Sequence, residues 1–358
     1  MDVQETLKAF KARLDPKIAA YFDMTVKRIK VDDVLVAEAL EQVKKLTLAG
    51  GKRLRPAFMY YGYLAAGGDK QETLLDTTVA IELIHMFLLI HDDIIDRDDL
   101  RHGVPTLHER YAQWGCEYLQ LQDGSHFGNS IAIIVGDMLF ALGNDVIFHS
   151  GFPHDRIFSA LSTMQHVVSH TVIGQAKDIY MEYRGEAPES EILKMYENKT
   201  ARYTIEGPLH IGAHLAGGSA ELMRVFSAYA LPLGIAFQIQ DDILGIFGDE
   251  ARTGKPVGSD IAEGKITLLV SHALERAART ERQELEKILK LGAKLTLSDI
   301  ARFRDIIVKC GSLEYAKGLA ARHIETGKQA LIQSEVSMNA EAKDFFLSVA
   351  DYLTNREY

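Results

Sequence analysis

Cysteine, tryptophan and proline are scarce in this sequence, and positive charge is not in excess. The chain of 358 residues has only two cysteines, Cys116 and Cys310, without the spacing of a disulfide framework or a zinc site, so a reducing cytoplasm is expected. Its 40 basic and 50 acidic residues give a net charge of −10, which argues against general nucleic-acid binding. Local basic clusters must therefore bind any anion.

Long hydrophobic runs are also lacking. The most apolar stretches, residues 79–90 and 131–142, are interrupted by Glu82, His85 and Asp137 and are too short to cross a bilayer. The first residues lack the basic and then apolar layout of a signal peptide. We expect no transmembrane segment and no export, and we expect these stretches to be buried helices.

Apolar residues recur at three- and four-residue spacing along most of the chain, which predicts an all-α fold in one domain over residues 1–358. Residues 113–128 are polar and irregular and are predicted to form a surface excursion. The predicted helices cover residues 34–48, 54–65, 73–96, 130–148, 156–183, 189–205, 220–247, 267–290, 297–309 and 312–331, and a last one ends near residue 355.

Two aspartate clusters follow apolar helical stretches, at residues 92–96 and 241–245. Asp92 and Asp96 are one helical turn apart and share a face, whereas the second cluster has Asp241 and Asp242 but ends in Gly245. Magnesium is usually bound by one or two carboxylates and the phosphate oxygens of a substrate. The clusters therefore indicate a phosphorylated ligand between them.

Basic groups that could bind this ligand lie near both clusters. The loop at residues 50–56 carries Lys52, Arg53 and Arg55 after two glycines and suits a diphosphate, although it lacks the Walker pattern. Arg101 and His102 follow the first cluster in a turn-prone segment. Further polar candidates lie downstream, namely Lys199, Thr200, Gln238, Lys255, Asp260 and Lys265.

Taken together, these motifs resemble the trans-isoprenyl diphosphate synthases, or polyprenyl synthetases, of the short-chain type that makes geranylgeranyl diphosphate. The resemblance covers most of the chain, with its motifs at residues 50–265. It implies a large helical bundle around a central active-site cavity, a homodimer, and Mg²⁺ as the cofactor, with about three ions per site once diphosphate is bound. The two departures are His102, where the family usually has arginine, and Gly245, where it has a third aspartate.

The resemblance also implies the roles of individual residues. Asp92, Asp96 and Asp241 would hold the metal, with Asp249 as a further candidate, and Arg101, Lys199 and Lys255 would help to neutralise the departing diphosphate of the allylic substrate. The Lys199 carbonyl, Thr200 and Gln238 would stabilise the allylic cation. The residues implied in binding isopentenyl diphosphate are Gly51, Lys52, Arg55, His85 and His102. The remaining polar positions that match the family are Gln175, Asp178, Asp242 and Lys265.

Phe87 lies one to two helical turns before Asp92, where the side of an apolar pocket is expected, and Leu88 follows it. In the family that the chain resembles, a single aromatic side chain there implies geranylgeranyl diphosphate rather than farnesyl diphosphate, although farnesyl or longer products stay open. A class I terpene cyclase and a non-catalytic synthase subunit are the alternatives. The basic loop argues against the cyclase, and the retained metal positions of both clusters argue against the subunit.

Overall fold

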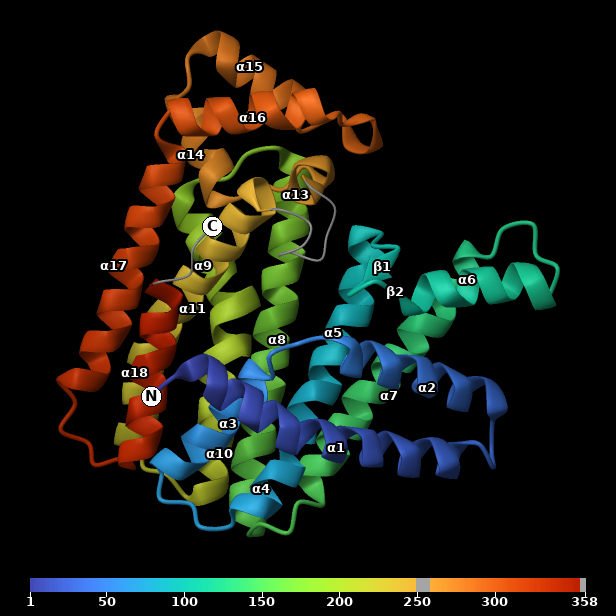
Figure 1. The fold of residues 1–358 in the computed structure, drawn as a ribbon, viewed down its shortest axis with the longest axis vertical. Helices are drawn as coiled ribbons and strands as arrows, with labels where there is room; N and C mark the ends of the chain where they lie inside the picture. The colour runs from blue at the N-terminus through green and yellow to red at the C-terminus, as the bar shows by residue number, and fades with distance from the viewer. Residues whose placement is uncertain (249–257, 355–358) are drawn as a thin grey trace. The chain divides into compact units, whose positions relative to one another are not determined.

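The computed structural model describes residues 1–248 and 258–354, and helices make up nearly all of them (Figure 1). Two compact units are distinguished, residues 1–161 with 211–217, and residues 162–210 with the remainder of the chain after 217. The all-α prediction is confirmed. The single-domain prediction stays a prediction.

The first unit begins with two helices that run side by side, α1 and α2 (Figure 1). Asp2 caps α1 by accepting from the backbone N–H groups of Gln4 and Glu5. Its helices are α1 (Val3–Ile29), α2 (Val34–Ala49), α3 (Leu54–Ala65), α4 (Gln71–Thr77), α5 (Val79–Asp96), α6 (Leu107–Tyr118) and α7 (Ser125–Phe148). The only sheet in the described parts of this unit pairs β1 (Leu100–Arg101) with β2 (Val104–Pro105) in antiparallel register.

In the second unit, α11 packs along most of α17 and against the π-helix η1. Two helices, α8 (His154–Arg184) and α10 (Gly207–Ala216), have residues in both units. The other helices are α9 (Glu189–Tyr196), η1 (Glu197–Glu206), α11 (Ala220–Phe247), α13 (Ser259–Glu263), α14 (Leu268–Arg276), α15 (Arg279–Ile288), the 3₁₀ turn η2 (Gly292–Lys294), α16 (Leu297–Lys309), α17 (Ser312–Ile332) and α18 (Ala340–Thr354).

Several helix predictions need correction. Helix α1 was not predicted, because Pro16 interrupts its pattern, yet the helix continues through it. The segment 113–128 is partly helical, since α6 extends to Tyr118 and α7 begins at Ser125. The predicted helix 267–290 is two helices, because the backbone is extended at Ala277 and Ala278.

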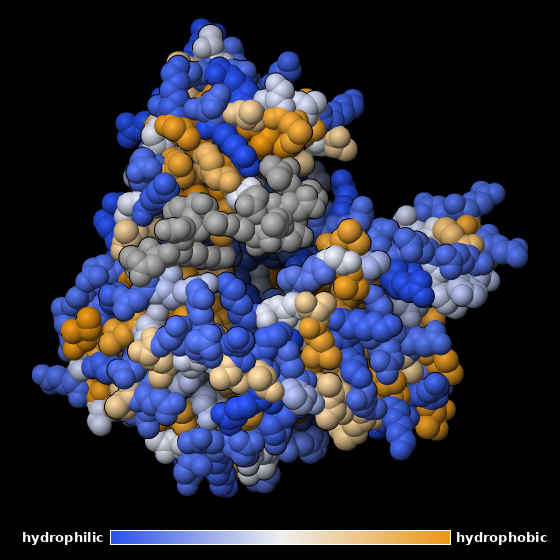
Figure 2. Space-filling model, in the orientation of Figure 1, coloured by the Kyte–Doolittle hydropathy of each residue, from blue (hydrophilic) through white to orange (hydrophobic). Residues whose placement is uncertain are grey.

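Three helical stretches are long and apolar enough to cross a membrane when judged by length and composition alone, namely Gln71–Asp96, Ser125–Phe148 and Ala220–Phe247. The length argument of the sequence analysis was therefore wrong for the first two stretches, which contain residues 79–90 and 131–142, and the third was not considered there. The most apolar window of Gln71–Asp96 is 72% buried inside the protein, so this stretch, formed by α4 and α5, lies largely in the core. The corresponding windows of Ser125–Phe148 and Ala220–Phe247 are 33% and 44% buried. The face of the molecule in Figure 2 is mostly hydrophilic, with hydrophobic side chains in separate places.

Candidate active site

The first aspartate cluster forms the last turns of α5. Asp92 and Asp96 are both partly exposed, whereas Asp93 between them is buried. The helix ends because Arg97 adopts a left-handed conformation with φ 59°. The two exposed carboxylates are one turn apart, as the spacing predicts.

The buried Asp93 is bound by Arg101 of β1. Arg101 donates two hydrogen bonds to the same carboxylate oxygen, one of them from Nε at 2.8 Å, and its other near carboxylate is Asp98 at 3.7 Å. Burial raises the pKa of Asp93 to about 6, against the opposing effect of the Arg101 charge. Arg101 thus fixes the hairpin to the end of α5, and its predicted contact with substrate stays a prediction.

The basic loop lies between α2 and α3, and its three cations have different surroundings. Lys52 is exposed, while Arg53 is buried and paired with acidic groups. Arg55 NH1 lies 3.2 Å from Nε2 of His85 on α5. Removal from water, together with the nearby Arg55 charge, lowers the pKa of His85 well below its usual value, so its neutral ring accepts from Arg55.

His102 stands at the tip of the β1–β2 hairpin. It has φ 52° and Gly103 has φ 75°, and two successive positive values are typical of a type I′ turn. The ring of His102 covers Gly50 so closely that a Cβ on Gly50 would lie 2.4 Å from it. The hairpin therefore touches the basic loop, and desolvation and Arg101 lower the pKa of His102.

In the second unit, the predicted polar residues gather around the π-helix η1. Nζ of Lys199 donates to Asp178 of α8 at 2.6 Å, and Oγ1 of Thr200 donates to Oε1 of Gln238 on α11 at 2.5 Å. The sequence predicted an ordinary helix through residue 205, which is wrong for residues 197–206. π-Helical turns are rare and occur often at functional sites.

The second aspartate cluster repeats the arrangement of the first. Asp241 is partly exposed, and Asp242 is buried, where it accepts from the hydroxyl of Tyr196 and, at 2.8 Å, from Nε2 of Gln238. Burial raises the pKa of Asp242 to about 8, and the charge of Asp260 acts in the same direction. The buried aspartate of the pair is hydrogen-bonded within the fold, and the other stays partly exposed.

Gly245, the position without the expected third aspartate, is covered by another carboxylate. A Cβ on Gly245 would lie 1.9 Å from Oδ2 of Asp260, which α13 provides. Lys265 lies 2.5 Å from Glu263 and 3.8 Å from Asp260. Lys255 and Asp249 lie outside the described residues, so their predicted roles stay predictions.

The predicted pocket wall is aromatic on two helices. The ring of Phe87 on α5 lies 4.9 Å from that of His91 and 5.3 Å from that of Phe140 on α7, measured between centroids. Leu88 is partly exposed and next to Phe87. Phe140 is therefore a second candidate for this wall that the sequence analysis missed.

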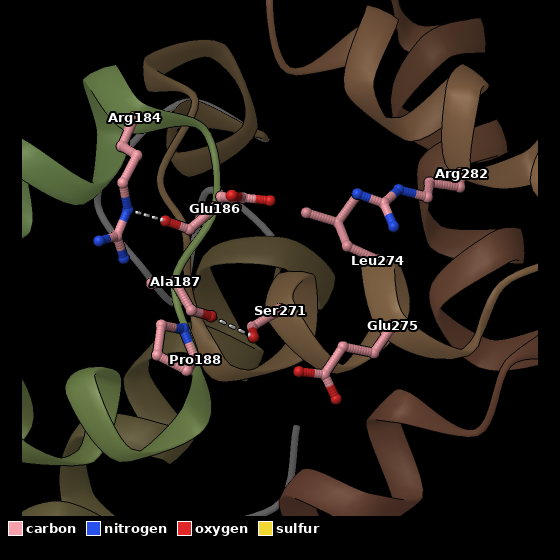
Figure 3. A pocket seen from close by; sticks show the side chains of 8 residues that line it. All are labelled: Arg184, Glu186, Ala187, Pro188, Ser271, Leu274, Glu275 and Arg282. Carbon is pink, nitrogen blue, oxygen red and sulfur yellow. Dashed lines mark hydrogen bonds between the residues drawn. The ribbon is translucent and has the colours of Figure 1, made fainter.

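A pocket elsewhere in the second unit has none of the predicted site residues (Figure 3). Arg184 donates to the Glu186 carbonyl at 2.6 Å, and Ser271 donates to the Ala187 carbonyl at 2.7 Å. Its lining residues are Arg184, Glu186, Ala187, Pro188, Ser271, Leu274, Glu275 and Arg282. This pocket and the predicted site are therefore separate features of the chain.

Within each unit, the structure thus brings together residues that the sequence only placed in order. Three groups of contacts were missed: Lys11, Asp15 and Glu82 around the basic loop, Tyr196 at Asp242, and Asp260 at Gly245. Asp260 had a signal, since lysines flank it in the sequence. Lys11 and Asp15 had no such signal in the sequence, because helix α1 itself was not predicted.

Comparison with known proteins gives a consistent result. The model of the polyprenyl synthetase family matches residues 37–306. The chain is 33% identical over 358 residues to a short chain isoprenyl diphosphate synthase of Methanothermobacter thermautotrophicus, which covers 100% of both chains. It is 34% identical over 332 residues to a geranylgeranyl diphosphate synthase of Methanosarcina mazei, covering 92% of this chain and 94% of that protein.

A solved structure is similar over the full length. It is the geranylgeranyl pyrophosphate synthase of Corynebacterium glutamicum complexed with isoprenyl diphosphate and magnesium, with a TM-score of 0.91, 32% identity and coverage of 100% of both chains.

Proposed function

The chain belongs to the polyprenyl synthetase family and is a prenyltransferase, and we propose that it condenses isopentenyl diphosphate head to tail with an allylic diphosphate. The observation that carries this is the repeated aspartate arrangement, in which Asp93 and Asp242 are buried while Asp92 and Asp241 are partly exposed. The proposed product is geranylgeranyl diphosphate, in line with the names of its relatives.

Isopentenyl diphosphate is proposed to bind at the basic loop of the first unit. Lys52 and Arg55 supply positive charge, and the backbone N–H of Gly51 adds a donor. Because His85 and His102 have lowered pKa values, both rings are neutral at pH 7 and act as hydrogen-bonding groups.

The partly exposed carboxylates suit Mg²⁺, which prefers oxygen ligands. We propose that Asp92 and Asp96 bind Mg²⁺ in the first unit and that Asp241 binds Mg²⁺ in the second. Among the described residues no group of three or more histidines, cysteines and carboxylates is close enough to hold an ion. Carboxylates in ones and twos suit an ion whose other ligands are waters and diphosphate oxygens. Bound Mg²⁺ would neutralise the charge that develops on the departing diphosphate.

The residues around η1 are proposed to stabilise the allylic cation left when the carbon–oxygen bond breaks. The Thr200 hydroxyl, the Gln238 amide oxygen and the Lys199 carbonyl are dipoles that attract a cation without reacting with it as a strong nucleophile would. The Lys199 ammonium contributes charge near Asp178. The alkene of isopentenyl diphosphate then attacks, and the released diphosphate takes the proton that leaves.

A second copy of the chain is the proposed partner. Helix α7 exposes apolar side chains, with Ile134 60% and Phe148 62% exposed, on the helix whose apolar window is only 33% buried. An apolar helix that leaves this much of its window exposed is typical of an interface. We propose a cytoplasmic homodimer in which each chain is one catalytic domain, and light scattering of the purified protein tests the mass.

The deciding experiment incubates the purified protein with labelled isopentenyl diphosphate, Mg²⁺ and each allylic diphosphate, and sizes the products. Chain elongation with release of diphosphate is expected. A cyclised product from the allylic substrate alone would identify a class I terpene cyclase. Activity only after a second, different subunit is added would identify a non-catalytic subunit.

A further inference from the structure

Helix α1 lies outside residues 37–306, the segment that the family model matches, yet it contacts the basic loop directly. Nζ of Lys11 donates to the carbonyl oxygens of Gly50 at 3.3 Å and Gly51 at 3.2 Å. The same ammonium lies 3.0 Å from Asp15, one turn further along α1. The two hydrogen bonds to the carbonyls therefore tie the loop to α1, and the ion pair with Asp15 holds the Lys11 side chain in place.

Arg53 ties the other end of the loop to the same helix. Its Nε donates to Asp15 at 2.7 Å, NH1 donates to Glu82 of α5 at 2.6 Å, and NH2 donates to the Thr47 carbonyl at 2.7 Å. Arg53 is 4% exposed and has φ 55°, which is uncommon for a residue with a side chain. The three partners hold it in that conformation, so Arg53 fixes the loop from within.

The contacts of Lys11 also decide which way the loop amides point. The described peptide bonds are all trans, and in a trans peptide the N–H points away from the carbonyl across the C–N bond. With the Gly50 and Gly51 carbonyls turned to Lys11, the N–H groups of Gly51 and Lys52 point to the opposite side. The loop would otherwise sample many conformations, because Gly50 and Gly51 restrict it little.

We infer that Lys11 and Asp15 of α1 are positioning residues that pre-organise the basic loop for isopentenyl diphosphate. This inference rests on the proposed function. Lys11 holds the two carbonyls that would repel a diphosphate and aims the amides at it, while Asp15 connects Lys11 to Arg53. The helix outside the family's matched segment is thus part of one substrate site.

Steady-state kinetics and calorimetry on the full chain test the inference, with Lys11→Met as the main variant. Loss of charged hydrogen bonds that order the loop should raise KM for isopentenyl diphosphate about tenfold, with kcat and the KM of the allylic diphosphate changed less than about twofold. Calorimetric titration with isopentenyl diphosphate should show the same loss of affinity. Asp15→Asn should also raise KM for isopentenyl diphosphate, and Lys11→Arg, which keeps the charge, should retain most of the affinity.

Lys17→Met is the matched control, because Lys17 is on the same helix and pairs with Asp76 at 2.6 Å, away from the loop. Equal changes in Lys11→Met and Lys17→Met, or equal rises in both KM values, would show that α1 is only structural and would overturn the inference. A wild-type protein that forms no elongated product contradicts the proposed function instead. Calorimetric affinity lost in Lys11→Met but kept in Lys17→Met would then still support the role of Lys11.

Discussion

The carboxylate of Asp260 occupies the space in which a side chain at Gly245 would begin, with Oδ2 1.9 Å from the Cβ position. The second aspartate motif ends in that glycine. Asp260 of α13, fifteen positions later, occupies the space of the missing side chain. The negative charge of Asp260 also contributes to the raised pKa of Asp242. Positions 245 and 260 therefore compete for the same space, and only one of them can place a carboxylate there.

Restoring the family's aspartate with Gly245→Asp should harm the protein. The new side chain meets Asp260, and overpacking of this kind costs about 1–3 kcal/mol in the free energy of unfolding. Urea unfolding measures the loss. The double variant Gly245→Asp with Asp260→Ala should recover most of the stability, since it keeps one carboxylate and removes the clash. A double variant whose two effects simply add would show that the residues are independent.

Asp92→Ala should remove most turnover and leave the fold intact. Asp92 is partly exposed, so its loss creates no cavity, while loss of a group that stabilises the departing diphosphate costs about 100-fold or more in kcat. Product formation at saturating Mg²⁺ and the circular dichroism spectrum measure the two effects. Asp145→Ala, at an exposed carboxylate of α7, is the control. Unaltered activity of Asp92→Ala would contradict the proposed metal site.

Phe87→Ala should give products longer than geranylgeranyl diphosphate. The ring of Phe87 contacts that of Phe140 5.3 Å away, so Phe140→Ala should lengthen the products as well and the double variant should lengthen them further. Chromatography of the dephosphorylated products gives the chain lengths. Phe158→Ala, at a 75% exposed position of α8, should not change them. An unchanged distribution in all three site variants would place the end of the pocket elsewhere.

The contribution of His85 to stability should turn unfavourable as pH falls below about 6.5, the ordinary pKa of histidine, whereas the raised pKa values of Asp93 and Asp242 act in the opposite direction. The pKa of His85 is lowered in the folded protein, so below pH 6.5 the unfolded chain binds a proton that the folded chain does not. Unfolding is then favoured, and this contribution is absent at higher pH. Urea unfolding at pH 7.5 and about 5.5 measures it by comparison: on going to the lower pH, His85→Gln should change in stability more favourably than the wild type, whereas His126→Gln at an exposed position should follow the wild type.

The sequence predicted most of the helices because their apolar periodicity is strong. The bounds of α3, α11 and α16 agree with the prediction, and Ser219 and Thr296 cap the last two of these helices, as start residues do. Helix α1 was missed because Pro16 lies within it, and the π-helix η1 was missed because its residues have the pattern of an ordinary helix. Such features depend on packing against the rest of the unit.

The sequence by itself determined which residue types are available for the chemistry: two aspartate clusters, a basic loop and an aromatic side chain before the first cluster. Only the tertiary structure decided which of them are buried and which stay partly or fully exposed. Asp92 and Asp93 are neighbours of the same type, yet burial and Arg101 commit Asp93 to the fold, and Arg53 is likewise committed beside Lys52. A side chain's partners come from distant segments, such as α1 at the loop and Asp260 at Gly245, and sequence order does not give those contacts.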